Sequence, residues 1–367
     1  MSKLLFVTMQ PFYPDSSGGA QQSSLYLFDS LRRLGWQIEV LCGLRLRSPY
    51  VQRACWQSIA GLRWPPQVIK DEDLGYPCWR RMIKFSQTRD WLKWLQHHLQ
   101  TYQPDVVLGH TSPHCPLLNH AARQGYASFY FARELSSLEA GVPISDQIHV
   151  IANSPFSAAA VASVTCKQVG VVLPFVDSDQ YRVLERDRRY ITFINPVPEK
   201  GVEVAIKIAH NLPQAWFLFV KGKWSRYKNS SQEAFIKTAY SLPNVEIWPH
   251  QKDMRQVYSM TDILLMPSQF SETFGRVIIE AQANRIPVVA ADVGGIPYTL
   301  GAGGILVKPK NHTQGYVDAL QQLRADDSLY ARLSAQAFEN SQRPEFKPRY
   351  QVQRFIDFIE SQSLAIR

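Results

Sequence analysis

The feature that most constrains the fold is a repeated alternation of short apolar runs with helix-patterned segments. The first apolar run covers residues 4–8, and another covers residues 38–41. Between them lies a helical pattern, with apolar side chains on one face and a glycine after its end: Leu27, Phe28, Leu31, Leu34 and Gly35. Alternating strands and helices are typical of α/β domains with parallel sheets, so we predict that fold class.

The same alternation restarts in the second half of the chain, at an apolar run over residues 191–194. Four more apolar runs follow it, at residues 216–220, 245–248, 263–266 and 286–290. A chain of 367 residues is also too long for one ordinary domain. We therefore predict two α/β domains, residues 1–175 and 176–348, and a final helix over residues 349–367.

Between two apolar runs of the second half lie two carboxylates in a Glu-x7-Glu spacing, Glu272 and Glu280. If a helix starts near Gly275, Glu272 sits in the loop before it and Glu280 lies inside it. Free backbone amides at that helix start favour an anion, so one acid can face a sugar while the other faces a nucleotide ribose. A two-carboxylate hydrolase is the competing enzyme class. It fits poorly, because a glycosidase does not need two nucleotide-type domains.

Residues 271–281 resemble the donor site of retaining GT-B glycosyltransferases, specifically the GT4 family, and the resemblance covers nearly the whole chain. It implies a GT-B fold, in which two Rossmann-like parallel α/β domains face an interdomain cleft and the C-terminal helix crosses back to the first domain. It further implies that residues 176–348 bind a nucleotide-sugar donor and that residues 1–175 hold the acceptor. Retention in this family needs neither a dedicated nucleophile nor a metal.

The resemblance also assigns roles in the donor site. Glu280 would accept hydrogen bonds from the ribose hydroxyls, and Glu272 would orient the donor sugar. Lys200, in a Pro-Glu-Lys-Gly segment, resembles the lysine whose charge stabilises the departing nucleotide diphosphate. The family usually has an arginine five residues earlier, where this chain has Asn195. Other cations that can add positive charge are Lys221, Lys223, Arg276 and, as the weakest candidate, Arg226. Phe274 and Gly275 complete the predicted nucleotide-sugar-binding set.

In the first domain, the loop after the first apolar run contains Gly18 and Gly19. The pair resembles the family's Gly-Gly motif, where glycine lets backbone amides approach the donor phosphates and the acceptor. We expect no metal, because the histidines and the cysteine near one loop have irregular spacing: His110, His114, Cys115 and His120. The metal-dependent Asp-x-Asp pattern of other glycosyltransferases is also incomplete here.

The acceptor side departs from the family. Many relatives have a histidine after the strand that corresponds to residues 129–131, whereas this chain has Arg133 and Glu134. Arg133 can bind an anionic acceptor or the donor phosphate, and Glu134 can orient a sugar hydroxyl. His110 follows another strand at its carboxyl end, where α/β folds place ligand groups. We therefore predict catalytic roles for five residues: Glu272, Lys200, Arg133, Glu134 and His110.

The net charge of +9 points to an anionic partner. The excess is concentrated in residues 45–93, here called the basic segment, whose cations are Arg45, Arg47, Arg53, Arg63, Lys70, Arg80, Arg81, Lys84, Arg89 and Lys93. The interleaved tryptophans are Trp56, Trp64, Trp79, Trp91 and Trp94. We expect residues 45–81 to form an irregular insertion.

Two interpretations of the basic segment stay open. One is contact with an anionic membrane or a lipid-linked acceptor. The other is a solvated basic face with tryptophans packed in the core. Nucleic acid is the weakest alternative, because no nucleic-acid module motif is present.

The five cysteines are scattered and form no Cys-x-x-Cys pair, which favours reduced thiols in a cytosol. The start of the chain resembles a buried strand more than a signal peptide, and no run is long enough to span a bilayer. We expect a cytoplasmic protein, with peripheral contact on the inner membrane face as the membrane alternative.

The sequence as a whole predicts a retaining, metal-independent glycosyltransferase. It would move a sugar from a nucleotide-sugar donor to a glycan, lipid-linked or small-molecule acceptor, in a setting such as surface polysaccharide biosynthesis. Two other functions stay open. One is a GT-B nucleotide-sugar epimerase. The other is a catalytically degenerate protein that binds sugar nucleotides, which Asn195 and the missing histidine leave possible.

Overall fold

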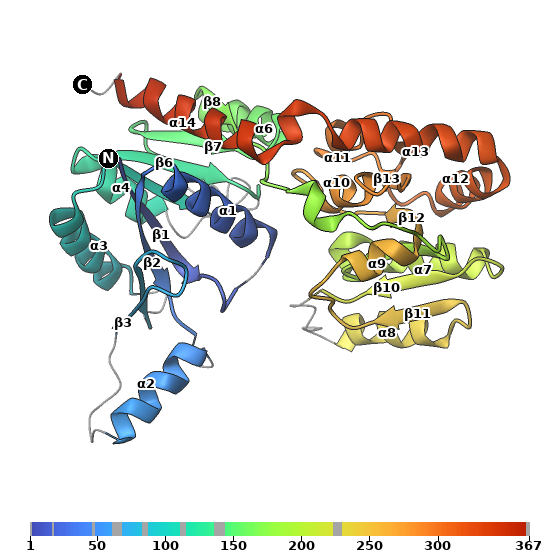
Figure 1. Ribbon diagram of the computed structural model, residues 1–367, viewed down its shortest axis with the longest axis horizontal. Coiled ribbons are helices and arrows are strands. Elements are labelled where there is room, and N and C mark those ends of the chain that lie inside the picture. The colour runs from blue at the N-terminus through green and yellow to red at the C-terminus, as the bar shows by residue number, and fades with distance from the viewer. Residues whose placement is uncertain are drawn as a thin grey trace. The chain divides into compact units, whose positions relative to one another are not determined.

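The computed structural model describes residues 2–16, 18–45, 48–60, 68–82, 87–110, 115–135, 144–222 and 230–364. The chain forms two compact units (Figure 1). Unit 1 comprises Met1–Phe175 and Gln351–Arg367, and unit 2 comprises Val176–Tyr350. Several residues named above lie outside the described residues: Arg47, Arg63, Trp64, Lys84, His114, Lys223 and Arg226.

Unit 1 is built on an eight-stranded sheet in the order β3-β4-β2-β1-β5-β6-β7-β8. The strands are β1 Lys3–Pro11, β2 Gln37–Gly43, β3 Val68–Asp71, β4 Cys78–Arg81, β5 Val106–His110, β6 Ala127–Ala132, β7 Ile148–Ala152 and β8 Val169–Val171. Neighbouring strands are parallel except for the pair β3 and β4. The central strand β1 is buried over Leu4–Met9, as expected where helices cover both faces of a parallel sheet.

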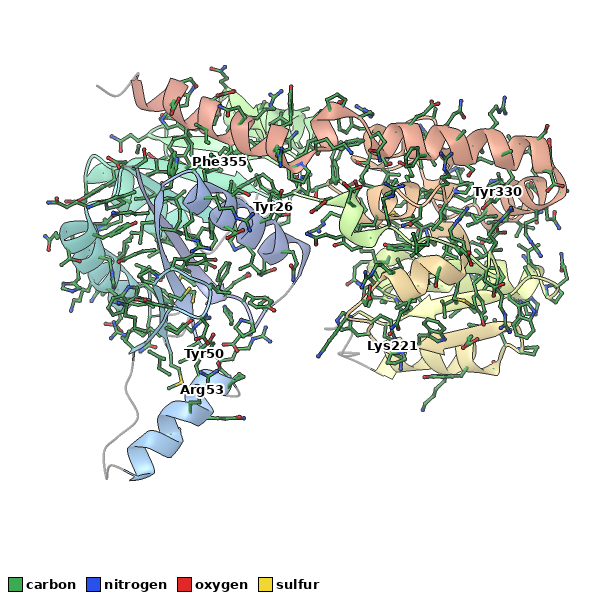
Figure 2. All side chains as sticks on the ribbon, in the orientation of Figure 1. Tyr26, Tyr50, Arg53, Lys221, Tyr330 and Phe355 are labelled. Atoms are coloured by element: carbon green, nitrogen blue, oxygen red, sulfur yellow. The ribbon has the colours of Figure 1, made fainter. Side chains whose placement is uncertain are left out.

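The helices of unit 1 are α1 Gly19–Arg33, α2 Pro49–Ala60, α3 Thr88–Tyr102, α4 Cys115–Arg123 and α6 Pro155–Thr165. The last helix, α14 Pro348–Leu364, joins them from the far end of the chain. Its side chains Phe355 and Ile359 are buried in the same core as Phe6, and Figure 2 labels Phe355 among them. The backbone amide of Leu173 also donates to the Gln351 side-chain oxygen at 2.7 Å. The prediction that the C-terminal helix returns to the first half of the chain is therefore confirmed.

The basic segment is more regular than the sequence predicts, and the expectation of an irregular insertion over residues 45–81 was wrong. It contains α2, β3 and β4, and β4 extends the sheet by pairing in parallel with β2. Four-residue strands such as β3 and β4 are too short to show a clear alternating pattern in the sequence. Helix α2 begins with Tyr50 and Val51 buried, and its later turns extend away from the sheet (Figure 1).

Arg80 also corrects the interpretation of the basic segment as one exposed surface. The residue is fully buried, forms an ion pair with Asp71 and donates to the Tyr13 carbonyl at 2.9 Å. Its guanidinium lies 4.3 Å from the centre of the Tyr50 ring. Because a buried charge is tolerated only when it is paired, Arg80 serves the interior of unit 1 and not a partner surface.

Other parts of the basic segment divide between core and surface. Trp91 and Trp94, on α3, are buried in a core cluster. Arg89 and Lys93, on the same helix, are exposed. The core interpretation therefore holds for these two tryptophans, while the exposed cations of α3 remain available to an anionic partner.

Unit 2 has a six-stranded parallel sheet in the order β11-β10-β9-β12-β13-β14. Its strands are β9 Tyr190–Ile194, β10 Phe217–Val220, β11 Val245–Trp248, β12 Thr261–Met266, β13 Val288–Ala291 and β14 Gly304–Val307. Its helices are α7 Val202–Asn211, α8 Ser230–Ser241, α9 Arg255–Met260, α10 Arg276–Gln282, α11 Ile296–Leu300, α12 Thr313–Ala325 and α13 Asp327–Ser341, with short 3-10 turns η2 Ser178–Tyr181, η3 Pro198–Lys200 and η4 Pro344–Phe346. Because the strands are parallel, all their carboxyl ends meet at one edge, where the loops after β9, β12 and β13 come together.

Candidate functional site

The Glu-x7-Glu segment lies at this carboxyl edge of unit 2. Strand β12 leads into a loop over residues 267–275, and α10 begins at Arg276. Gly275 precedes the helix with a φ of 84°, a left-handed conformation that glycine adopts without strain. As expected, Glu272 lies in the loop and Glu280 lies within the helix.

Lys200 and Glu272 form an ion pair, although 72 residues separate them in the sequence. The ammonium nitrogen of Lys200 donates to Glu272 Oε1, and the Ser268 hydroxyl lies 3.5 Å from the same oxygen. The Lys200 side chain is 28% exposed and the Glu272 side chain 9%, so the lysine is the more accessible member of the pair. The structure thus brings together two residues that the sequence assigned separately to phosphate and sugar binding.

A close approach of two loops makes this pair possible. Gly201 follows Lys200 with a φ of 85°, and a Cβ at this position would lie 1.9 Å from the carbonyl oxygen of Pro267. The backbone amide of Gln269 donates to the Glu199 carbonyl at 2.9 Å. Only glycine fits at position 201, and its small size lets the two loops meet.

Two glycines after β13, Gly294 and Gly295, support Glu272 from the other side. A Cβ on Gly294 would lie 2.2 Å from the Glu272 carbonyl oxygen, and one on Gly295 would lie 2.1 Å from that of Thr273. The Gly295 amide donates to the Glu272 carbonyl at 2.6 Å. No role was predicted for these two residues from the sequence, although a Gly-Gly pair after a buried strand is a usable signal of close backbone approach.

Glu280 is buried, with 6% of the residue exposed. The Tyr258 hydroxyl donates to its Oε2 at 2.8 Å, and Arg276 Nε lies 3.8 Å from its Oε1. Burial raises the pKa of the Glu280 carboxyl, while the Arg276 charge and the tyrosine hydrogen bonds lower it. Glu280 is therefore a carboxylate held in place by its neighbours, and a ribose hydroxyl would have to join or replace the tyrosine donors.

Tyr181 is the second tyrosine in this group. Its pKa is raised to about 12, first by the charge of Glu280 and then by burial. Asn284 fixes the segment around it, donating to the Tyr181 carbonyl at 3.0 Å and accepting from the Val183 amide at 2.8 Å. No local pattern in the sequence signals Tyr181 or Tyr258, because only the tertiary fold places them beside Glu280.

Other predicted donor-site residues have structural contacts of their own. Asn195 has a φ of 63°, a left-handed conformation that asparagine tolerates better than arginine does, and its amide donates to the Val220 carbonyl at 2.8 Å. Lys221, labelled in Figure 2, directly follows that neighbouring strand, and its ammonium donates to the Tyr240 hydroxyl at 3.2 Å. The Phe274 ring is buried against Phe346, with ring centres 5.9 Å apart.

In unit 1, the predicted residues gather where the strands end. Gly18 precedes α1, and Gly19 is the first residue of that helix. Arg133, which follows β6, donates to the Ala20 carbonyl and lies 2.8 Å from the Ser24 hydroxyl. The Arg133 guanidinium therefore braces the first turn of the helix that carries the Gly-Gly pair.

Glu134 and His110 differ in their exposure to solvent. Glu134 is exposed, although partial desolvation by nearby protein raises the pKa of its carboxyl. His110 is 1% exposed at the end of β5 and packs edge-on against Phe6 at a ring distance of 5.0 Å. Among the described residues, no group of three or more His, Cys, Asp or Glu side chains is placed to hold a metal ion.

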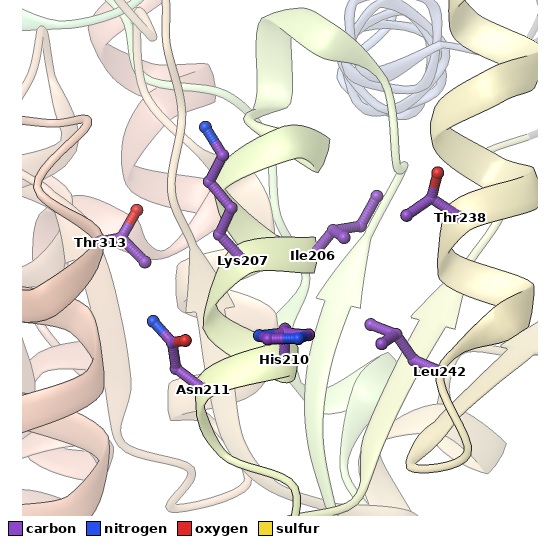
Figure 3. Close-up of a pocket in the computed structure, with 7 residues that line it drawn as sticks. All are labelled: Ile206, Lys207, His210, Asn211, Thr238, Leu242 and Thr313. Carbon is purple, nitrogen blue, oxygen red and sulfur yellow. The ribbon is translucent and has the colours of Figure 1, made fainter.

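A surface pocket of about 340 Å³ lies elsewhere in unit 2 (Figure 3). It adjoins the last turns of α7, where Ile206 and His210 line it together with Leu242. Lys207, also in its lining, is already paired with Glu203 at 2.9 Å. The Lys200 pair lies before the first turn of α7, so this pocket is separate from the predicted donor site.

Solved glycosyltransferase structures share the architecture of this chain. The structure resembles a glycosyltransferase from Rickettsia africae ESF-5, with a TM-score of 0.75, 15% identity and coverage of 98% of both chains. It also resembles Anabaena HepE in complex with UDP and glucose, with a TM-score of 0.76, 18% identity and coverage of 98% and 100%. Two parallel α/β units with such neighbours define a GT-B fold.

Sequence comparison finds a family match over part of the chain. Residues 178–340 match the family described as glycosyl transferases group 1, and the chain is also similar to D-inositol 3-phosphate glycosyltransferases over part of its length. It is 32% identical over 194 residues to a D-inositol 3-phosphate glycosyltransferase of Rhodococcus opacus, a match that covers 46% of this chain and 43% of the relative. The corresponding enzyme of Corynebacterium aurimucosum is 32% identical over 200 residues, or 47% of each chain. The chain thus spans less than half the length of these curated relatives.

Proposed function

We propose that this protein is a retaining glycosyltransferase that moves a sugar from a nucleotide-sugar donor to a glycan, lipid-linked or small-molecule acceptor. The observation that carries the proposal is the Lys200–Glu272 ion pair, which sits at the carboxyl edge of the unit 2 sheet beside the helix that carries Glu280. Solved relatives of the same fold are in complex with UDP and with UDP-glucose, which supports a nucleotide-sugar donor.

In this proposal, each residue of the pair exchanges its present partner for part of the donor. Lys200 binds the diphosphate, whose negative charge grows as it departs, and Glu272 accepts hydrogen bonds from hydroxyls of the donor sugar. Glu280 accepts from the ribose hydroxyls, since its carboxylate is already oriented by Tyr258 and Arg276. The ion pair holds both side chains in position before the donor arrives.

The transfer itself needs no protein nucleophile. The acceptor oxygen forms a bond to the anomeric carbon on the same face from which the diphosphate leaves, and the acceptor proton passes to a phosphate oxygen. The configuration of the sugar is therefore retained. We propose that the reaction requires no metal, because protein cations supply the charge that the leaving group needs.

Unit 1 would supply the acceptor side. The Gly18–Gly19 turn gives backbone amides at the start of α1, and the exposed Glu134 is available to orient a hydroxyl. We assign Arg133 a positioning role, because it already bonds to the first turn of α1. No helix in the described part of the chain is long and apolar enough to cross a bilayer. We propose that a lipid-linked acceptor would be met at an anionic surface, through the exposed cations of α3.

The test begins with a thermal-shift screen against UDP-glucose, GDP-mannose and ADP-glucose, because a ligand that binds the folded state raises its melting temperature by mass action. The stabilising donor is then incubated with candidate acceptors, and the anomeric configuration of the product is read by NMR. Glu272→Ala should abolish transfer, whereas Glu203→Ala, which removes an exposed carboxylate of α7, should not.

Four results would contradict the proposal. An inverted product would exclude retention, and loss of transfer with a chelator would exclude metal independence. Release of nucleotide with an epimerised sugar and no acceptor product would instead identify an epimerase. Binding of a donor without any turnover would identify a sugar-nucleotide-binding protein.

A further inference from the structure

Phe270 is an exposed aromatic residue beside the Lys200–Glu272 ion pair. It is 38% exposed, and the ammonium nitrogen of Lys200 lies 4.8 Å from the centre of its ring. Its carbonyl accepts from the Glu272 amide at 3.0 Å. The ring therefore stands beside the ion pair, with its cation directly over the aromatic face.

Gln269, the residue before Phe270, anchors the loop that carries Phe270. The Gln269 side-chain amide donates to the Lys310 carbonyl at 3.0 Å and to the Pro267 carbonyl at 2.8 Å. The Lys310 ammonium in turn donates to the Gln269 carbonyl. The ring is thus exposed on a backbone that is fixed from both sides, which differs from an aromatic side chain on a loose surface loop.

Cation, carboxylate and ring together match the chemistry of a sugar phosphate. A pyranose ring offers hydroxyls at its edge and an apolar C–H surface on its face, while the attached phosphate is anionic. A ligand with its phosphate on Lys200 and its hydroxyls on Glu272 has to lie next to the Phe270 ring, because the ring adjoins both groups. Covering an exposed aromatic face stabilises a complex by removing apolar area from water.

We propose that Phe270 forms the apolar face of the donor-sugar subsite and is a specificity-determining residue for the sugar half of the donor. This inference rests on the proposed function, since it requires a nucleotide sugar at Lys200 and Glu272. It assigns to Phe270 contact with the hexose but not with the nucleoside. Phe270 should therefore matter for a nucleotide sugar and not for the corresponding nucleoside diphosphate.

The experiment compares two affinities by calorimetry, for a nucleotide sugar and for its nucleoside diphosphate. UDP-glucose with UDP, GDP-mannose with GDP and ADP-glucose with ADP are the probe pairs, and the pair that binds wild type best is used. Four variants are measured: Phe270→Ala, Phe270→Leu, Phe270→Tyr and the control Trp216→Ala. Trp216 is 47% exposed and immediately precedes β10, at the opposite edge of the same sheet, so its loss changes exposed aromatic surface without touching the site.

We expect Phe270→Ala to weaken nucleotide-sugar binding about tenfold, which corresponds to about 1.4 kcal/mol, while affinity for the nucleoside diphosphate stays within about twofold. Phe270→Leu should lose most of the same affinity. Leucine keeps apolar volume, but it has no flat face to lie against a sugar ring. Phe270→Tyr and Trp216→Ala should match wild type. Melting temperatures of all four variants check that the fold is intact.

Two outcomes would overturn the inference. If Phe270→Ala and Phe270→Leu lower the affinity for the nucleotide sugar and for the nucleoside diphosphate equally, the ring acts by shielding Lys200 and not by contacting the sugar. If neither variant changes either affinity, the ring is an ordinary exposed side chain. A wild-type protein that binds none of the three nucleotide sugars would instead contradict the proposed function, and that result is separate from either outcome.

Discussion

At the scale of single residues, the proposed donor site consists of charges that already have partners. Lys200 donates a hydrogen bond to Glu272, and Tyr258 donates one to Glu280. Both carboxylates therefore have protein partners before a ligand binds. Such pairs cost little to reorganise when the ligand supplies equivalent hydrogen bonds. Single substitutions should therefore reveal which contacts the donor replaces.

Replacing Glu280 with alanine should weaken binding of the free nucleoside diphosphate. The variant loses charge-assisted hydrogen bonds to the ribose, each worth roughly 1.5–3 kcal/mol. Calorimetry with UDP, GDP and ADP measures the change, and Glu203→Ala on α7 is the control for a lost carboxylate. Unchanged affinity in Glu280→Ala would remove this residue from the site.

Replacing Lys200 with alanine should lower kcat more than it raises KM. The charge of the departing diphosphate grows toward the transition state, so its cation is needed most there. Lys207→Ala removes an exposed lysine of α7 and serves as the matched control. A raised KM with unchanged kcat would show that Lys200 only anchors the donor in the ground state.

The buried state of Glu280 also predicts how stability depends on pH. Its folded-state pKa lies above the ordinary value of 4.5. At a pH between the unfolded-state and the folded-state pKa, the native state therefore holds a proton that the unfolded state has released. Stability from this group is therefore present below about pH 4.5 and is lost as pH rises through the folded pKa.

The variant Glu280→Gln has no such titration, so it should melt at a higher temperature than wild type near pH 8. The difference should shrink near pH 4, where wild-type Glu280 is protonated. Melting curves between these pH values test the sign. An advantage that grows as pH falls would show that the carboxylate is stabilised, and not penalised, by its surroundings.

At the scale of elements, the site depends on loops that touch through glycine. Gly201 meets the loop after β12, and Gly294 and Gly295 meet the backbone of Glu272. Through these contacts, the loops after β9, β12 and β13 together hold Glu272 in position. The position of Glu272 is therefore set by three strands of the sheet and not by its own loop alone.

Gly294→Ala tests this support. The added Cβ would lie 2.2 Å from the Glu272 carbonyl oxygen, so the loop must move. Gly125→Ala is the control, because Gly125 also has a positive φ, of 85°, but nothing lies within 4 Å of a Cβ placed there. Strain in the left-handed region alone costs about 1–2 kcal/mol.

We expect Gly294→Ala to lower the free energy of unfolding by more than Gly125→Ala does, and also to impair donor binding. Denaturant unfolding and calorimetry measure the two effects. Equal losses of stability, with donor binding intact in both variants, would mean that the loop relaxes around the methyl group without moving Glu272.

At the scale of the whole molecule, the net positive charge is divided between interior and surface. Arg80 neutralises Asp71 inside unit 1, whereas Arg89 and Lys93 lie exposed one helical turn apart on α3. Only exposed cations attract an anionic surface, so the formal charge of the basic segment overstates its attraction. The prediction of membrane contact therefore rests on α3 and not on Arg80.

The double variant Arg89→Glu with Lys93→Glu should bind anionic liposomes much less than wild type. Each basic residue near such a surface contributes about 1 kcal/mol, screened by salt. The same change of charge at Arg324 and Arg332, exposed on α12 and α13 of unit 2, provides the control. If wild type does not sediment with anionic liposomes at low salt, membrane contact is excluded.

The sequence by itself determined the fold class and the local frame of the donor segment. The spacing of apolar residues distinguishes strands from helices wherever the element is long. The start of α10 was predicted from Gly275, which is visible in the sequence. The return of α14 to unit 1 followed from the family resemblance. The strands β3 and β4 escaped prediction because four residues carry too little periodicity, and the 12-residue helix α2 escaped it because the prolines of this region suggested irregular structure.

Only the tertiary structure decided which side chains meet. The pairing of Lys200 with Glu272, the tyrosines around Glu280 and the burial of Arg80 all join residues that are distant in the sequence. A sequence specifies residue types and local spacing, but the partner of a charged group depends on how parallel strands deliver their loops to one edge. For that reason the chain predicts which residues can do chemistry, and the fold decides which of them are placed to do it together.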